Sequence, residues 1–377
     1  ILKDWRAIGS KGATARKDWL ARKAGSPKAK EFDDTMAGVL PQSLDGALLT
    51  LKQKIASEKP SAGTRKMSEQ ALNVINAELA FTIGGSADLT PSNNTRTRNI
   101  SEIGPDRFDG RYVHYGIREH GMCAAMNGMA LHGGILPYGG TFMVFSDYCR
   151  PAIRLAALMG IRVVFVMTHD SIGVGEDGPT HQPVEHLAAL RAIPNLLVMR
   201  PADGVETAEC WELAVKSENR PSLIAFSRQD VPTLRENPTA ENLCARGAYV
   251  LVEDAAAKVT LLASGTEVSL AMEARVKLAA EGIAARVVSM PSWLLFEAQP
   301  LDYRRAVLGP GTVKVAIEAA VREGWDRYIG SQLLDGEAGA FIGMHSFGAS
   351  GPYKDVYAKF GITADAAVAA AKKLLGK

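Results

Sequence analysis

From about Arg65 onward, short apolar runs alternate with longer stretches in which apolar residues recur at helical spacing. The apolar runs are bounded by Gly, Pro, Ser and Asn, as β-strands usually are. They read "FTIGG", "RYVHYG", "ILPYGGTF", "IRVVFVM", "NLLVMRP" and "PSLIAFS". Between them lie helix-like segments such as "SEQALNVINAEL" and "SDYCRPAIRLAALMG". Strands that alternate with helices predict a parallel sheet covered by helices on both faces.

A polar connector, "RQDVPTLRENPTAENLCARG", separates a second unit of the same kind. In that unit "KVTLLASG", "ARVVSMP" and "VKVAIEAA" read as strands, and "TEVSLAMEARVKLAAEG" as a helix. We therefore expect the α/β fold class, with two successive α/β domains that have parallel or mixed sheets, at residues 63–235 and 246–377. Residues 1–62 are expected to form a basic, partly helical linker, since residues 1–66 hold 14 Lys and Arg against 7 Asp and Glu.

The composition excludes several classes of protein. With 47% hydrophobic and 22% charged residues it is that of an ordinary globular chain. No apolar run approaches the roughly 18 residues that span a bilayer, so no membrane partner is expected. The net charge is +2, and no aromatic platform for stacking bases accompanies the charge of the basic linker, so no nucleic-acid partner is expected either. The four cysteines form no C-x-x-C pair, which argues against zinc and disulfides and predicts a cytoplasmic location.

The loop "THDSIGVGEDGPTHQPVEH", residues 168–186, contains a formal G-x-G-x-x-G match. A dinucleotide-binding turn requires these glycines to open a helix, whereas here they run into "PTHQP". We therefore reject that interpretation. A mobile polar surface loop remains an alternative, but a long loop at the carboxyl end of a buried parallel strand is where α/β proteins place ligands.

Several segments together resemble transketolase in the order and spacing of that family. They are "GGSADLTPSN" (84–93), "HYGIREHGM" (114–122), "LPYGGTFMVFSDYCR" (136–150), "THDSIGVGEDGPTHQPVEHLAALR" (168–191), "SRQ" (227–229), "RVVSMPS" (286–292) and "FGASGP" (347–352). The resemblance covers essentially the whole chain and implies the family's pyrimidine-binding and C-terminal domains, which have the fold of thiamine-diphosphate enzymes. The G-D-G…N pattern of the family's N-terminal domain has no counterpart here. We therefore expect the diphosphate, and its Mg²⁺ or Ca²⁺, to be held by a domain outside this chain, which itself supplies no metal ligand.

The resemblance implies that the chain binds the pyrimidine side of thiamine diphosphate. Glu119 would hydrogen-bond the aminopyrimidine ring nitrogen and assist the proton transfer that activates the cofactor. Taken alone, this residue could equally be a helix-start carboxylate favoured by the helix dipole. Phe142, Phe145 and Tyr148 are spaced at i, i+3 and i+6, and aromatic residues with this spacing more often belong to a core than to a ligand site. In the resembled family, however, the residues at these positions pack against the pyrimidine ring of the cofactor. The remaining cofactor contacts implied are Asp88, Leu89, Phe142, Phe145 and Tyr148.

The resemblance also implies a sugar-phosphate substrate. Its phosphate would be bound by Arg65, Ser92, His169 and Arg228, since guanidinium groups and hydroxyls suit phosphate oxygens. Asp177 would accept a hydrogen bond from a sugar hydroxyl, and His181 would polarise the carbonyl or relay a proton, which makes it the second catalytic residue beside Glu119. His120, His132 and His186 are expected to be ordinary helix residues, while His114 and His345 are unassigned.

The function implied is transfer of a two-carbon ketol unit from a ketose phosphate to an aldose phosphate, a step of the pentose phosphate pathway. The chain would act as a homodimer or in assembly with a chain that carries the diphosphate-binding domain. One alternative is a β-type subunit of a thiamine-dependent 2-oxo-acid dehydrogenase, which the phosphate-binding set disfavours because a small oxo acid has no phosphate. A related sugar-phosphate synthase that uses pyruvate is a weaker alternative. A non-catalytic fragment or subunit that needs a separate chain also remains open.

Overall fold

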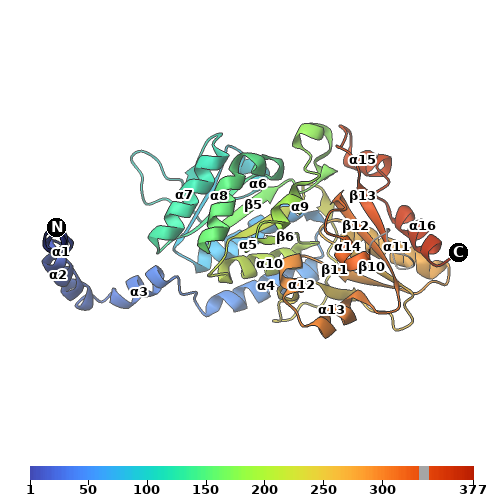
Figure 1. Ribbon diagram of the computed structural model, residues 1–377, viewed down its shortest axis with the longest axis horizontal. Helices are drawn as coiled ribbons and strands as arrows, with labels where there is room; N and C mark the ends of the chain where they lie inside the picture. Colours follow the sequence, from blue (N-terminus) through green and yellow to red (C-terminus); the bar gives the residue numbers. More distant parts are fainter. Residues whose placement is uncertain (331–338) are drawn as a thin grey trace.

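The computed structural model describes residues 1–330 and 339–377 and shows two α/β units behind a helical N-terminal arm (Figure 1). The fold class expected from the sequence is confirmed, with one parallel and one mixed sheet. Within the described ranges, no helix is both long enough and apolar enough to cross a bilayer.

The first unit is built on a six-stranded parallel sheet, which we call the first sheet, with strand order β3-β2-β4-β5-β7-β6. Its strands are β2 (Thr82–Ser86), β3 (Tyr112–His114), β4 (Leu136–Phe142), β5 (Val164–Thr168), β6 (Leu197–Met199) and β7 (Ser222–Phe226). Successive residues of β5 pack on opposite faces, Val164 and Val166 into one core and Phe165 and Met167 into another.

Helices cover both faces of the first sheet. The core that contains Val164 is closed by α4 (Ser43–Glu58), α5 (Thr64–Glu78) and α10 (Gly204–Lys216). The opposite core is closed by α7 (Glu119–His132), α8 (Ser146–Met159) and α9 (His186–Arg191). Burial on both faces explains why these strands read as continuous apolar runs.

The second unit holds a five-stranded sheet of order β13-β12-β10-β11-β9, in which only β9 runs antiparallel to its neighbour. Its strands are β9 (Tyr249–Val252), β10 (Val259–Ala263), β11 (Ala285–Ser289), β12 (Val313–Val321) and β13 (Ala340–Met344). One face is covered by α11 (Glu267–Ala280), α15 (Tyr353–Lys359) and α16 (Ala364–Leu374). The other is covered by α12 (Trp293–Glu297), α13 (Leu301–Leu308) and α14 (Asp326–Ile329).

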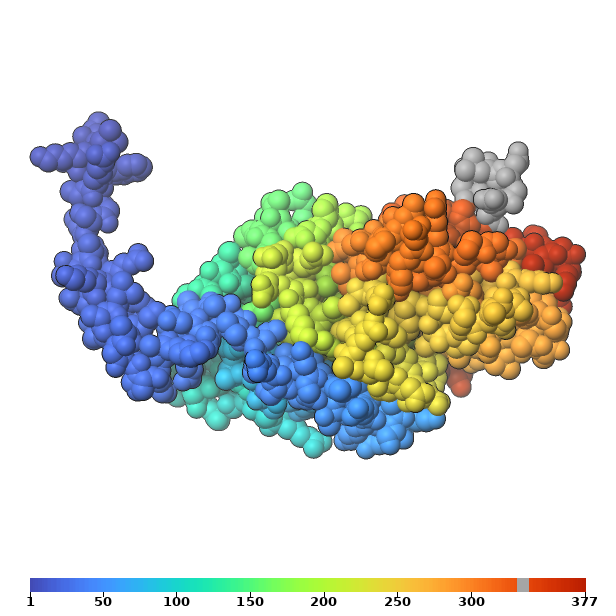
Figure 2. Space-filling model, turned by 90° about the horizontal axis from the view of Figure 1, so that it is seen from below, coloured from blue at the N-terminus to red at the C-terminus, as the bar shows by residue number. Residues whose placement is uncertain are grey.

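The N-terminal arm, residues 1–37, stands away from the body of the molecule (Figure 2). Its helices α1 (Leu2–Ser10), α2 (Ala13–Ala24) and α3 (Ala29–Ala37) bury no residue. The remaining short elements are β1 (Ala62–Gly63), β8 (Asp230–Val231), α6 (Thr90–Asn93), η1 (Met143–Phe145), η2 (Ile172–Asp177), η3 (Pro179–His181) and η4 (Leu243–Arg246).

Buried charges join the two units. Arg200, fully buried just after β6, donates to the carboxylates of Asp170 in the first unit (Nε–Oδ2, 2.9 Å) and Glu267 in the second. Arg191, at the end of α9, forms a bidentate pair with Glu318 of β12, with both N–O distances at 2.8 Å. Because buried charges are stable only when paired, these contacts fix how the units sit against each other.

Candidate active site

The residues expected to form the site lie along one edge of the first sheet. All its strands are parallel, so their carboxyl ends share that edge, where α/β proteins bind ligands. These residues lie at or just after the carboxyl ends of five strands. Asp88 and Leu89 follow β2, Glu119 follows β3, Phe142 and Phe145 lie at the end of β4, His169 follows β5 and Arg228 follows β7. Consecutive strands thus bring together residues that lie far apart in the sequence.

Aromatic rings form a continuous line along this edge. Phe145 contacts Tyr148 at a centroid distance of 5.8 Å and stacks on Phe142 at 5.7 Å. The ring of His181 packs edge-on against Phe145 at 5.5 Å, and that of His169 lies against Phe142 at 4.6 Å. A flat, largely apolar surface is thereby offered to a planar ring, with the imidazoles of His169 and His181 both against Phe142.

Cationic groups gather at the His169 end of this line. Arg65, at the start of α5, donates from Nη1 to the backbone carbonyl of Ser92 (2.8 Å), and Arg228 donates from Nη1 to that of Val174. Burial lowers the pKa of Arg65, and the positive charge of Arg228 lowers it further. Two guanidinium groups close enough to repel each other form a site suited to an anion.

A close backbone approach places Arg65 beside Arg228. The short antiparallel pair of β1 and β8 sets Gly63 against the carbonyl of Arg228, and a Cβ at Gly63 would lie 2.6 Å from that oxygen. Only glycine permits this contact. Thr64, at the start of α5, and Ser227, just after β7, hydrogen-bond each other through their hydroxyls and backbone amides. These bonds hold the start of α5 at the carboxyl edge of the first sheet.

His169 is neutral in this setting. Burial, together with the positive charges of Arg65 and Arg228, lowers its pKa to about 3. Its Nδ1 atom and the Nε atom of Arg65 are buried without a hydrogen-bond partner among the described residues. Buried polar atoms are normally hydrogen-bonded, so both atoms are available to bind a ligand. Two carboxylates compete for these arginines: Glu176, exposed, lies 3.5 Å from Arg228 Nη1, and the charge of Asp230 acts on Arg65.

The glycine-rich loop after β5 turns twice at left-handed backbone positions. Gly175 and Gly178 both have φ of +80°, a conformation that glycine adopts at little cost. The turns carry Asp177, which is exposed, and His181, which is half-buried, to the mouth of the site. The second unit braces this loop, because Gln182 donates to the carbonyls of Gly175 and Ala349, both at 2.9 Å. The motif is therefore a structural turn and not a nucleotide cradle.

Glu119 is the first residue of α7 and is only 8% exposed. Within the described part of the chain, its carboxylate makes no hydrogen bond or ion pair. The carboxylate oxygens are not among the enclosed polar atoms without a partner, so they remain open to a ligand that donates to them. One turn further along α7, Cys123 contacts Cys149 of α8, which ties the helix of Glu119 to the helix of Tyr148. A carboxylate and an aromatic wall on adjoining helices fit the aminopyrimidine ring of thiamine diphosphate.

Not every residue expected in the site contacts the aromatic line in the structure. Asp88, Leu89 and Glu119 make no hydrogen bond, ion pair or ring contact with the aromatic line in the ranges that are described. Asp88 is exposed and has φ of +61°, a left-handed conformation that Asp tolerates better than most residues. Tyr148 is 66% exposed, so one side of the wall faces solvent.

The buried charges at the junction of the two units were missed in the sequence. Asp170 directly follows His169, and its carboxylate is held by Arg200, so the junction also anchors the start of the glycine-rich loop. The only available signal was charged residues directly after apolar runs, as in "VMTHD" and "VMRP". That pattern is shared by solvent-exposed strand ends, so it does not identify a partner.

Two family models match the chain. The model described as "Transketolase, pyrimidine binding domain" matches residues 61–233, and the one described as "Transketolase-like TK C-terminal domain" matches residues 247–363. A transketolase of Cereibacter sphaeroides is 55% identical over 373 residues, which are 99% of this chain and 56% of that protein. A chloroplastic transketolase of Craterostigma plantagineum is 42% identical and covers 100% of this chain and 72% of its own length.

Solved structures agree. The transketolase of Pichia stipitis in complex with sedoheptulose 7-phosphate has a TM-score of 0.87 and 37% identity, and the match covers 97% of this chain and 54% of that one. A split-gene transketolase, solved as an inactive β4 tetramer, has a TM-score of 0.68 and 26% identity, and the match covers 84% of this chain and 99% of that one. The fold is thus that of the thiamine-diphosphate-dependent transferases as a class. Within that class, the chain belongs to the transketolase family. It spans about half the length of the first curated relatives that it matches.

Proposed function

We propose that this chain supplies the pyrimidine-binding and substrate-phosphate-binding part of a transketolase, which transfers a two-carbon ketol unit from a ketose phosphate to an aldose phosphate. The observation that carries the proposal is the convergence of Arg65 and Arg228 on a buried, neutral His169. This anion site lies at the opposite end of the aromatic line from Tyr148. A sugar chain between a reacting carbonyl and a terminal phosphate fits that separation, whereas the oxo acid of a 2-oxo-acid dehydrogenase has no second anionic end.

The residues on the cofactor side fit the pyrimidine of thiamine diphosphate. When bound, that cofactor supplies a thiazolium carbon that adds to the substrate carbonyl and carries the two-carbon unit. Glu119 would hold a proton at the ring nitrogen of the aminopyrimidine, which its burial and lack of a partner support. Phe142, Phe145 and Tyr148 would cover the ring face and exclude water from it. Asp88 and Leu89 would lie beside the cofactor at its exposed edge.

The substrate would lie along the same line of rings. Arg65, Arg228 and the Ser92 hydroxyl would bind phosphate oxygens, and His169 would donate or accept one hydrogen bond as a neutral imidazole. His181, packed on Phe145, is placed to hold a proton near the carbonyl oxygen. Asp177, exposed on the turn above, would accept a hydrogen bond from a sugar hydroxyl and so select its configuration.

The cofactor diphosphate and its Mg²⁺ or Ca²⁺ would be bound outside residues 1–377. The split-gene relative, solved as an inactive β4 tetramer, supports the need for assembly with a second chain. A homodimer is the alternative arrangement. Four free, buried cysteines favour a reducing compartment, and we place the enzyme in the cytoplasm and in the pentose phosphate pathway. Residues 63–235 would form the pyrimidine-binding domain and residues 246–377 the C-terminal domain.

The test is ketol transfer by an assembled enzyme. The chain is joined to, or mixed with, the diphosphate-binding part of a close relative, and conversion of xylulose 5-phosphate and ribose 5-phosphate is followed. We expect product only when both parts and thiamine diphosphate are present. An assembled, cofactor-loaded enzyme that transfers nothing between sugar phosphates, yet accepts a 2-oxo acid, would replace the proposal with the dehydrogenase alternative.

A further inference from the structure

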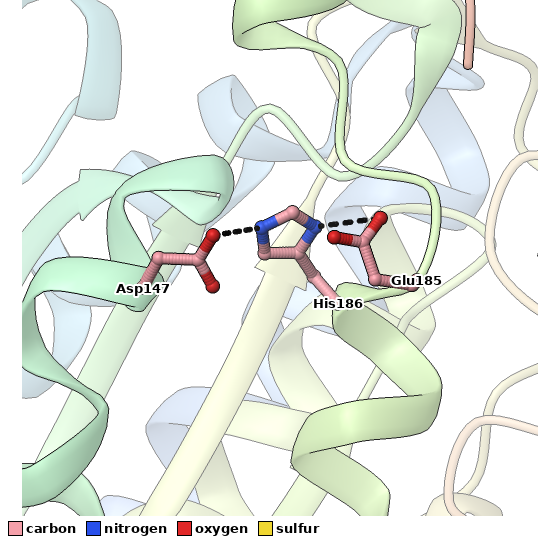
Figure 3. A group of neighbouring side chains, drawn as sticks. All are labelled: Asp147, Glu185 and His186. Atoms are coloured by element: carbon pink, nitrogen blue, oxygen red, sulfur yellow. Dashed lines mark ion pairs between the residues drawn. The ribbon is translucent and has the colours of Figure 1, made fainter.

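Three side chains outside the site described above have the composition of a transition-metal site. Asp147, Glu185 and His186 each offer one ligand atom, and these atoms lie within 4.8 Å of one another. Asp147 belongs to the first turn of α8, while Glu185 and His186 form the start of α9, so the group connects two helices (Figure 3).

His186 is the buried member of the group. Its side chain is 6% exposed, with Nε2 at 3.3 Å from Asp147 Oδ2 and Nδ1 at 3.8 Å from Glu185 Oε2. Even so, neither ring nitrogen has a hydrogen-bond partner in the part of the chain that the structure describes. The ring lies between the two carboxylates (Figure 3). A buried imidazole that is turned toward carboxylates without hydrogen-bonding them is suited to receiving a cation.

The distances suit a small ion after one adjustment. Ligand atoms of a tetrahedral zinc ion stand roughly 3.3 Å apart, because each bond is about 2.0–2.1 Å long. The oxygen of Asp147 and Nε2 of His186 already have that separation. The Glu185 oxygen lies nearest Nδ1, the other ring nitrogen, so its side chain, which is 54% exposed, has to turn toward Nε2 and close a gap of at most 4.8 Å by about 1.5 Å.

We propose that Asp147, Glu185 and His186 bind one divalent transition-metal ion of the Zn²⁺ type, with a remaining position open to water. One imidazole with two carboxylates favours zinc over Mg²⁺ or Ca²⁺, which take oxygen ligands. The ion would link the start of α9 to the first turn of α8, which carries Tyr148. This site does not depend on the proposed transferase activity.

The experiment is calorimetric titration of the purified chain with Zn²⁺ alone, without thiamine diphosphate or a chelating buffer. One site per chain is expected in the wild type, and His186→Gln should weaken it at least about tenfold, as loss of a ligand requires. The matched control is His114→Gln, which removes an exposed histidine 3.1 Å from Glu102 and should leave zinc affinity unchanged. Saturating Zn²⁺ should raise the Tm of the wild type and the control but not that of His186→Gln.

A second variant keeps the test valid if His186→Gln fails to fold. Asp147 is 66% exposed, so Asp147→Asn removes a ligand charge without disturbing the core, and it should also weaken zinc binding at least about tenfold. Equal affinity for Zn²⁺ in the wild type and Asp147→Asn would overturn the proposal. So would a wild-type chain that binds no Zn²⁺ in the micromolar range.

Discussion

Replacing Arg228 by Gln removes one of the two guanidinium groups at the phosphate end of the site and keeps a polar side chain. A charge-assisted hydrogen bond is worth about 1.5–3 kcal/mol. At 1.4 kcal/mol per factor of ten, the KM for an aldose phosphate should rise about 10- to 150-fold. Arg228 is 41% exposed, and solvent screening weakens exposed charges, so we expect a value near the lower end, about tenfold.

Stability should respond differently from affinity. The pair that Arg228 forms with Glu176 is exposed and contributes about 0–1 kcal/mol, whereas its repulsion of Arg65 disappears in the variant. The Tm of the ligand-free chain should therefore stay nearly unchanged. This separates a phosphate-binding residue from a structural one.

The assay is steady-state kinetics of the assembled enzyme with ribose 5-phosphate and with ribose as acceptors. Only the phosphorylated acceptor should show the raised KM. Arg305→Gln, on the exposed side of α13, is the control and should change neither KM. Equal losses on both acceptors, or a large drop in Tm, would refute a role for Arg228 in binding phosphate.

Three further outcomes are expected. Glu119→Gln in the assembled enzyme should lower kcat by about 10²–10⁴ because it cannot hold the proton, with an unchanged Tm; activity within tenfold of wild type would exclude that role. In the folded state His169 stays neutral down to about pH 3, whereas in the unfolded chain it takes up a proton near pH 6.5. The free energy of unfolding should therefore decrease by about 1.4 kcal/mol for each pH unit below 6.5. Urea unfolding of wild type and His169→Gln at several pH values should show that slope in their difference, and parallel curves would contradict it. Arg191→Met removes the bidentate partner of the buried Glu318, which keeps hydrogen bonds from Ser264 and Trp325, so the cost should lie near about 3 kcal/mol, the lower end for a broken buried pair. Arg246→Met, at an exposed pair, should cost less than about 1 kcal/mol, and similar losses for both variants in urea unfolding would contradict the paired junction of the two units.

The fold could be predicted because strands that are buried on both faces of a sheet have a recognisable local sequence pattern. Strands such as β5 are continuous apolar runs, and the helices between them repeat at their own spacing. The antiparallel direction of β9 could not be predicted, since it depends on how a connector crosses the sheet. The pairing of Arg200 with Asp170 and Glu267 could not be predicted either, because charged residues after a strand look alike whether they meet solvent or a partner.

The site could be predicted as a set of residues at strand ends, together with the resemblance that names them. Its electrostatics could not. The neutral state of His169 results from burial and from two arginines that reach it from other elements, and the approach of Gly63 to Arg228 is a tertiary contact. His186 was expected to be an ordinary helix residue, and only the arrangement in space sets it between two carboxylates.

The most direct test of the central claim is a crystal structure of the assembled enzyme with thiamine diphosphate and a ketose phosphate. The account predicts an aminopyrimidine ring on Phe145, with its ring nitrogen within hydrogen-bond distance of Glu119. It also predicts a phosphate held between Arg65 and Arg228 against His169. A cofactor bound away from Glu119, or a substrate phosphate bound away from both arginines, would contradict it.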